Sequence, residues 1–204
     1  MIAIISYGLG NIRAFSNIYK RLDIPVTIAT APEHLTKATK IILPGVGAFD
    51  HAMERLEACE MYGPLNELVL SKKRPVLGVC VGMQMLAGSS EEGHRAGLGW
   101  INGVVRKLRF ADSADRGILP HMGWNTVRPE PERPLFAGLR AEALFYFLHS
   151  YYFECHDPVN AIAVADYAGS FTCAVQADNI YGVQFHPEKS HHNGIQLLKN
   201  FAEL

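Results

Sequence analysis

The chain is organised around the segment Gly78-Val79-Cys80-Val81-Gly82. It follows the apolar run 75–77, which predicts a buried strand, and it precedes the apolar segment 83–87, which predicts a helix. A G-x-C-x-G sequence between a strand and a helix is the cysteine form of the nucleophile elbow. The glycines permit a tight turn, so Cys80 is expected at the helix N-terminus with its sulfur exposed, where the thiolate is favoured. The motif alone does not separate a nucleophile from a packed, inert thiol.

The segments before the elbow alternate between apolar strands and amphipathic helices. Strands are expected near residues 2–5, 25–29, 40–43 and 75–79, and helices near 12–22, 49–56 and 65–71. In the second of these helices the periodicity predicts four inward-facing residues: Phe49, Ala52, Met53 and Leu56. This alternation predicts an α/β fold with a mostly parallel central sheet and helices on both faces. Ligands of such sheets bind beyond the carboxyl ends of the strands, where Cys80 and the loop Gly45-Val46-Gly47 both lie.

After residue 100 the pattern changes to short strands. We expect strands near residues 103–108, 126–128, 144–148, 151–155, 161–165, 172–176 and 181–185, followed by a helix at 193–203. We interpret them as mixed or antiparallel additions to the same sheet. The sequence shows no linker, repeat or low-complexity segment, so residues 1–204 are predicted to form one domain.

Composition and charge argue against several classes of function. The 19 basic and 20 acidic residues give a net charge of −1, which is not the footprint of a nucleic-acid-binding protein. No stretch has the length of a membrane span, and the N-terminus lacks a signal peptide, so we expect a cytoplasmic protein. The cysteines fit neither a zinc nor a disulfide pattern, and we expect no metal and no cofactor; they are Cys59, Cys80, Cys155 and Cys173.

A thiol nucleophile needs a base and an oxyanion hole. His186 follows the strand predicted at 181–185 and can take the Cys80 proton, and Glu188 can hold its imidazole in the right tautomer. The backbone N–H of Val81 is one oxyanion donor by elbow geometry, and that of Val46 is a candidate for the second. The alternatives are a loop histidine beside a solvated carboxylate, and an ordinary glycine turn.

Two motifs together resemble a known family. The elbow and the segment Gly182-Val183-Gln184-Phe185-His186-Pro187-Glu188 resemble the class I (triad) glutamine amidotransferases. Segments 7–11, 43–49, 120–125 and 146–151 are similar to the glutaminase subunits of imidazole glycerol phosphate synthase. The Pro-Gly-Val-Gly sequence at 44–47 is informative, since most relatives carry a Pro-Gly-Gly type loop there. The resemblance spans essentially the whole chain and implies the α/β amidotransferase fold.

The resemblance also implies a role for each matching residue. Cys80 attacks the side-chain amide of L-glutamine and forms a thioester, His186 shuttles protons, and Glu188 orients His186. The oxyanion is held by Val46 and Val81. Substrate binding falls to Gly45, Gln84, Glu92, Ser150 and Tyr151, and the ammonia exit and partner interface to Asn11, His121, Met122, Trp124 and Asn125. For Glu92 the alternative is a solvated pair with Glu91, and for Trp124 a place in the core.

The resemblance implies a partner as well. Ammonia in neutral water is mostly ammonium, which is not a nucleophile, so it must pass to its acceptor through a shielded path. The partner implied is a (βα)8-barrel cyclase in a heterodimer with this chain. It uses the ammonia to make imidazole glycerol phosphate for histidine biosynthesis, and a by-product serves purine synthesis.

Other readings stay open at this point. The stretches 151–155 and 189–192 look somewhat like paralogues that supply ammonia to a nucleotide-sugar amidotransferase in surface-polysaccharide synthesis. A non-catalytic scaffold, a cysteine peptidase and a redox-sensing elbow protein are further alternatives. Three histidines at 186, 191 and 192 could suggest a metal site, but no carboxylate or cysteine ligand set joins them. Position 6 is Ser where many relatives carry Asp.

Overall fold

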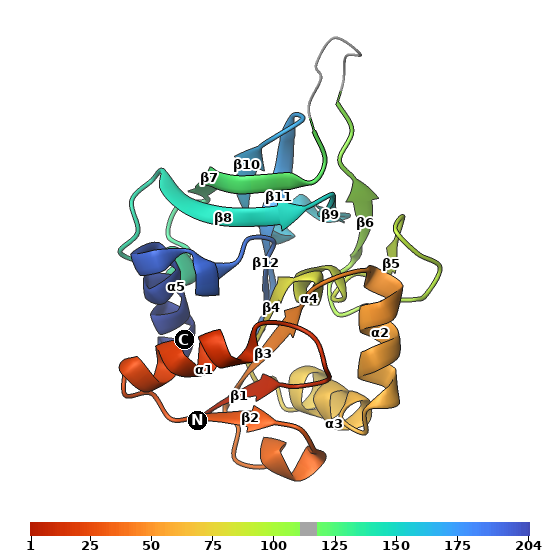
Figure 1. Ribbon diagram of the computed structural model, residues 1–204, viewed down its shortest axis with the longest axis vertical. Helices are drawn as coiled ribbons and strands as arrows, with labels where there is room; N and C mark the ends of the chain where they lie inside the picture. Colours follow the sequence, from red (N-terminus) through yellow and green to blue (C-terminus); the bar gives the residue numbers. More distant parts are fainter. Residues whose placement is uncertain (111–117) are drawn as a thin grey trace.

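The computed structural model describes residues 1–110 and 118–204 (Figure 1). Up to the elbow its elements are β1 (Ile2–Ile5), α1 (Ile12–Arg21), β2 (Val26–Ala29), η1 (Pro32–Leu35), β3 (Lys40–Gly45), α2 (Phe49–Ala58), α3 (Tyr62–Asn66), the π-helical η2 (Glu67–Ser71), β4 (Val76–Cys80) and α4 (Val81–Gln84). The later elements are β5 (Ser89–Ser90), β6 (Gly103–Lys107), β7 (His121–Pro129), η3 (Pro134–Phe136), β8 (Ala143–His149), β9 (Tyr151–Cys155), η4 (Pro158–Asn160), β10 (Ala161–Asp166), β11 (Ser170–Ala177), β12 (Ile180–Val183), η5 (Pro187–Lys189) and α5 (His191–Glu203).

A nine-stranded mixed sheet forms the centre of the molecule, with the order β2-β1-β3-β4-β12-β11-β10-β7-β8. The strands from β2 to β12 in this order are parallel, because helices connect those that precede the elbow. The strands from β12 to β8 pair antiparallel, and β11 and β12 are joined by a tight turn. The predicted α/β fold, with a parallel part and antiparallel additions, is therefore confirmed.

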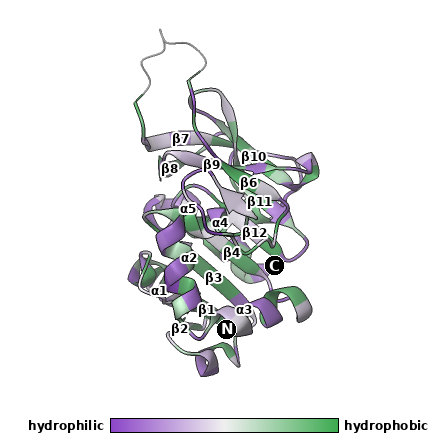
Figure 2. Ribbon diagram, turned by 90° about the vertical axis from the view of Figure 1, so that its right-hand side faces the viewer, coloured by the Kyte–Doolittle hydropathy of each residue, from purple (hydrophilic) through white to green (hydrophobic). Residues whose placement is uncertain are grey.

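Helices cover both faces of the parallel part, as predicted. Figure 1 shows α1 and α5 on one side and α2 and α3 on the other. Helix α1 buries Phe15 and Tyr19, and α2 buries the apolar residues expected from its periodicity: Phe49, Ala52, Met53 and Leu56. In Figure 2 the apolar colour is strong in the central strands such as β3, which lie between these helices. No helix within the described ranges combines the length and the apolar character that a membrane crossing needs.

One part of the fold prediction is wrong. We expected every later strand to join the central sheet, but β6 and β9 form a separate three-stranded sheet with β5. The chain turns at Ser150 between β8 and β9, where the Ser150 carbonyl accepts the Leu108 N–H at 2.9 Å. This turn carries β9 away from the sheet edge and places it against β6.

Two expected helices also differ from the prediction. The helix after the elbow is the short α4, which ends at Gln84, whereas segment 83–87 was expected to be helical throughout. The helix expected at 65–71 is split between α3 and η2. Neither difference moves the elbow, since β4 and α4 still meet at Cys80.

Candidate active site

The elbow is a strained turn between β4 and α4. Cys80 has φ 55° and ψ −115°, a conformation that costs an L-residue energy and is typical of functional sites. A Cβ at Gly78 would lie 2.6 Å from the Gly82 carbonyl oxygen, and one at Gly82 would overlap the Leu43 carbonyl of β3. Only glycine fits at either position, which explains the G-x-C-x-G sequence. The Cys80 residue is 4% exposed, so the expectation of an exposed sulfur is wrong: the side chain opens onto an internal hollow.

Strand pairing brings His186 beside Cys80. β12 runs parallel to β4 in a register that pairs Val183 with Val79, so the segment after β12 emerges beside Cys80. In that segment the His186 Nδ1–H donates to Glu188 Oε1 at 3.0 Å, and both side chains are buried. Burial by itself lowers the pKa of His186, but its hydrogen bonds with Cys80 and Glu188 and their negative charges outweigh it and raise that pKa from 6.5 to about 10. A thiol and an imidazole in this arrangement can act as a nucleophile and its base.

A hollow of about 350 Å³ surrounds this pair. Most residues that the sequence predicts for catalysis and substrate binding line it: Val46, Cys80, Val81, Gln84, Glu92, Ser150, Tyr151 and His186. Glu188 lies behind His186, and Gly45 lies against the elbow, where a Cβ would overlap the Gly82 backbone nitrogen. Two larger surface hollows, of about 690 and 830 Å³, contain no residue of the predicted triad.

The loop after β3 lies beside the elbow. Gly45 pairs with Cys80 in the β3–β4 register, and Gly47 has φ +88°, which favours glycine. The Tyr7 hydroxyl donates to the Pro44 carbonyl at 2.6 Å and anchors the base of this loop. Val81 begins α4, and an N–H in the first turn of a helix has no intrahelical partner. Both predicted oxyanion donors therefore belong to segments that border the Cys80 hollow.

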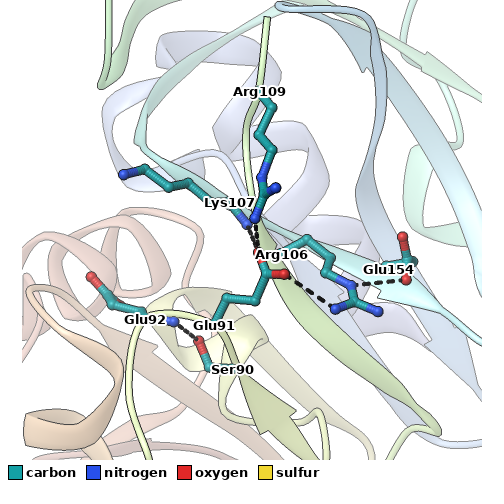
Figure 3. Close-up of polar contacts among 7 residues, drawn as sticks. All are labelled: Ser90, Glu91, Glu92, Arg106, Lys107, Arg109 and Glu154. Atoms are coloured by element: carbon teal, nitrogen blue, oxygen red, sulfur yellow. Dashed lines mark hydrogen bonds and ion pairs between the residues drawn. The ribbon is translucent and has the colours of Figure 1, made fainter. Parts of the chain in front are cut away.

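Neighbouring carboxylates at positions 91 and 92 point in opposite directions (Figure 3). Glu91 accepts the Lys107 backbone N–H at 2.8 Å and pairs with the Arg106 guanidinium at 3.2 Å. Glu92 turns the other way, lines the hollow, and accepts the Phe49 N–H at 2.8 Å at the start of α2. The two residues are thus not a solvated pair.

Glu92 is only partly buried, but its surroundings disfavour its charge. Burial raises its pKa above the ordinary value, the hydrogen bond from the Phe49 N–H opposes this, and the negative charge of Asp50 adds to the rise. A cationic group bound in the hollow would relieve this penalty. Glu92 is therefore suited to meet a substrate ammonium group.

Two glutamine side chains connect Tyr151, on the wall of the hollow, with Cys80. Gln84 Nε2 donates to the Tyr151 carbonyl at 3.2 Å and to Gln184 Oε1 at 3.0 Å. Gln184 Nε2 in turn approaches Cys80 Sγ at 3.7 Å. Both hydrogen bonds use Nε2 of Gln84, which links its side chain to Gln184 and Tyr151, and the residue also lines the hollow.

Several residues of this site have no role predicted from the sequence. Gln184 is fully buried just after β12, and a polar residue at the end of an apolar segment is a recognisable signal. His149 and Lys189 also line the hollow, and the Leu148 carbonyl lies 3.9 Å from Cys80 Sγ. No sequence signal points to a backbone carbonyl such as that of Leu148.

The predicted interface residues on β7 separate by strand alternation. Met122 and Trp124 are 63% and 48% exposed, so Trp124 does not belong to the core. His121 points inward and is buried, and Asn125 donates to His121 Nε2 at 3.2 Å. Asn11 lies exposed before α1, and its side chain makes no capping hydrogen bond.

The extra histidines after the catalytic loop do not gather into a metal-binding group. His191 stacks on Trp124 with ring centroids 5.2 Å apart. Within residues 1–110 and 118–204, no three His, Cys, Asp or Glu side chains are close enough together to hold a metal ion.

Comparison with known proteins supports the geometric interpretation. Residues 4–204 match the family model described as glutamine amidotransferase class-I. The chain is 57% identical to a protein of Bdellovibrio bacteriovorus and 53% identical to one of Leptospira interrogans, both named imidazole glycerol phosphate synthase subunit HisH, with 100% of each chain covered. It is 47% identical to HisH 2 of Pseudomonas aeruginosa over the same full lengths.

Solved structures show the same fold at low sequence identity. A crystal structure titled as a glutamine amidotransferase superposes with a TM-score of 0.75 at 17% identity, covering 100% of this chain and 99% of that one. The PurLQS structure from Thermotoga maritima gives a TM-score of 0.73 at 15% identity, covering 99% of this chain and 97% of that one.

Proposed function

The chain belongs to the class I glutamine amidotransferases, among the HisH subunits of imidazole glycerol phosphate synthase, and from this premise we propose that it hydrolyses L-glutamine and passes the ammonia to a separate cyclase subunit. Residues 1–204 form one amidotransferase domain in this proposal. The observation that carries it is the arrangement of Cys80 and His186 in one hollow, with Glu188 hydrogen-bonded to His186 from behind.

The reaction proceeds in two halves. The Cys80 sulfur attacks the side-chain amide carbon, and the carbonyl electrons move to oxygen. As the C–N bond breaks, His186 gives its proton to the leaving nitrogen, which departs as ammonia and leaves a thioester. His186 then takes a proton from water, the water oxygen attacks the thioester, and Cys80 leaves as the thiolate with release of glutamate. Glu188 keeps the His186 Nε2 directed at these atoms.

The oxyanion of each half is held by the N–H groups of Val46 and Val81. The glutamine backbone is bound at the other end of the hollow. Glu92 meets the substrate ammonium group, and the backbone of Ser150 and Tyr151 meets the remaining polar atoms. Gly45 acts by its position, because its lack of a side chain lets this loop approach the elbow.

Replacing Glu92 by Gln should weaken glutamine binding. Gln keeps an acceptor for the Phe49 N–H but loses the negative charge, so KM for glutamine should rise about 10- to 100-fold, from the ~1.5–3 kcal/mol of a charged hydrogen bond. In the parent protein KM should also rise as pH falls towards the raised pKa of Glu92, and the variant should lose this dependence. Steady-state kinetics in complex with the cyclase measures both effects.

The matched control for this variant is Glu91→Gln. It removes the same charge one residue away and keeps an acceptor for the Lys107 N–H, so KM should stay close to the parent value. Equal kinetics for Glu92→Gln and the parent protein would remove Glu92 from the binding site.

The partner covers the β7–β8 face in this proposal. Exposed apolar side chains alternate outward on these two strands: Met122, Trp124, Leu144 and Leu148. Leu148 also lines the hollow, so a subunit docked on this face closes the hollow against water and receives the ammonia directly. We propose that the partner is the (βα)8-barrel cyclase, bound as a heterodimer in the cytoplasm, with Asn11 at the edge of the same interface.

A charge on the docking face should disrupt the complex. Met122→Glu buries an unpaired carboxylate if the cyclase covers this face, and a disrupted interface centre typically costs ~2 kcal/mol or more, about 30-fold in Kd. Leu70→Glu is the control, since Leu70 is 44% exposed on η2. η2 directly follows α3, which Figure 1 shows apart from β7 and β8. Titration calorimetry with the cyclase gives Kd. Equal affinity for the two variants would place the partner elsewhere.

The proposal is tested by mixing the chain with a cyclase or with a nucleotide-sugar amidotransferase in the presence of L-glutamine. We expect glutamate release and imidazole glycerol phosphate formation only in the mixture of this chain with the cyclase. Each of the relatives described above carries the name of an imidazole glycerol phosphate synthase subunit, which favours this acceptor over the sugar. No glutamate in any mixture would contradict the glutaminase assignment.

A further inference from the structure

A buried chain of hydrogen bonds runs from β7 to the substrate hollow through two histidines. Asn125 Nδ2 lies 3.2 Å from His121 Nε2. His121 Nδ1 lies 2.9 Å from His149 Nε2, and His149 Nδ1 lies 2.8 Å from the Tyr151 carbonyl oxygen. Both rings are buried, and neither belongs to the triad.

The groups at the two ends of this series of hydrogen bonds, Asn125 and the Tyr151 carbonyl, determine which ring nitrogens of His121 and His149 are protonated. The Tyr151 carbonyl only accepts, so His149 must carry a hydrogen on Nδ1. Asn125 Oδ1 accepts the Thr126 N–H at 2.8 Å, so its Nδ2 faces His121, whose Nε2 must accept. The His121 Nδ1–H therefore donates to His149 Nε2. All the bonds point the same way, from Asn125 towards Tyr151.

This assignment requires both rings to be neutral. A second proton on His149 would point at the Nδ1–H of His121, and one on His121 would point at the Asn125 amide hydrogens. Burial lowers the pKa of His121 to about 4 and that of His149 to about 3, so both rings are neutral at pH 7. His121 is further enclosed between the rings of Phe147 and Tyr167, at 4.7 and 4.1 Å between centroids.

We propose that His149, held in one tautomer by His121, is a positioning residue that fixes the Tyr151 carbonyl and thereby the segment that binds glutamine. The inference rests on the proposed glutaminase function. The same carbonyl accepts Gln84 Nε2 at 3.2 Å, and Gln84 leads through Gln184 to the Cys80 sulfur. His149 and Gln84 thus both donate to the Tyr151 carbonyl. Through Gln84 and Gln184, this carbonyl is linked to the Cys80 sulfur.

Two substitutions at His149 distinguish the effect of its Nδ1–H donor from the effect of its side-chain volume. His149→Leu keeps much of the volume and removes the donor, so kcat/KM for glutamine should fall about tenfold or more, mainly through KM, as a buried carbonyl loses a partner. His149→Asn places an N–H near the position of the ring Nδ1 and should restore most of the loss. Glutamine kinetics are measured with the cyclase bound, alongside the thermal midpoint of each variant.

The matched control is the pair His156→Leu and His156→Asn. His156 Nδ1 also makes a hydrogen bond, at 2.8 Å to Asn102 Oδ1, but this ring is exposed and outside the hollow. Neither substitution should change KM for glutamine. Unchanged kinetics in His149→Leu, or an equal loss in His149→Leu and His149→Asn, would overturn the proposal, provided the parent complex releases glutamate. A parent complex that releases none would instead overturn the glutaminase assignment.

The tautomers give a readout that does not depend on activity. In ¹⁵N-histidine spectra at pH 7, His121 and His149 should each show a protonated Nδ1 and an unprotonated Nε2, with assignments from single-site variants. A proton on Nε2 of either ring would contradict the proposed tautomers and would overturn the proposal. This test stands even if His149→Leu does not fold.

Discussion

Cys80→Ala should abolish glutamine hydrolysis, because the variant has no atom that can form the thioester. Synthesis by the cyclase from added ammonium salts at high pH should survive, since that route bypasses this chain. The loss of a nucleophile that acts as part of a triad typically reduces the rate about 10⁶-fold. The measurement is glutamate release, and imidazole glycerol phosphate formation from either nitrogen source, by the complex of the variant with the cyclase.

The control variants are Cys59→Ala, Cys155→Ala and Cys173→Ala. Cys59 and Cys155 lie partly exposed outside the hollow, and Cys173 is buried in the core of β11. Each should keep glutaminase activity largely intact. Release of glutamate by Cys80→Ala at anything near the parent rate would mean that another group is the nucleophile.

The isolated chain should be nearly silent, and the partner with an acceptor analogue should raise its glutaminase rate about 100- to 1,000-fold, the effect of one oxyanion donor. The loop at Val46 provides a mechanism for this activation. We expect its peptide either to direct the Val46 N–H at the oxyanion or to turn it away. Gly47, which has a positive φ, permits the change because it has no side chain. The partner would act by contacting one of the two orientations better than the other.

Val46→Pro removes the N–H and should flatten this response, whereas Val46→Ala keeps the N–H and should retain it. Val46 is partly exposed, so loss of its side chain should cost little packing. Ammonia release is measured for each protein alone, with partner, and with partner and analogue. Full activity of the parent chain alone, or normal activation of Val46→Pro, would exclude this mechanism.

Much of the fold could be predicted because the relevant signals are local. The periodicity of α2 predicted all four of its buried residues, and the glycines around Cys80 predicted a turn that only glycine permits. The same local patterns could not say which sheet a late strand joins. β6 and β9 pair with each other because the chain turns at Ser150, and partner choice among short strands depends on such long-range geometry.

The candidate site divides in the same way. Residues with a reactive type in a recognisable spacing could be named from the sequence, such as Cys80, His186 and Glu188. The structure brings Cys80 and His186 to one hollow and places Glu188 behind His186. Residues held by buried long-range hydrogen bonds could not be named in this way. Gln184 follows β12 and His149 ends β8, and their hydrogen-bond partners lie 100 and 28 residues away along the chain.

The elbow and the His-Pro-Glu segment could be recognised in the sequence because they depend on residue type and short spacing. The way in which these residues are held depends on long-range packing. Parallel pairing of β12 with β4 sets His186 against Cys80, and the opposite directions of Glu91 and Glu92 assign one carboxylate to an ion pair and the other to the hollow. Successive residues of β7 point to opposite faces of the sheet, so Met122 is exposed and His121 is buried. Which of the two faces is covered depends on the packing of the whole protein.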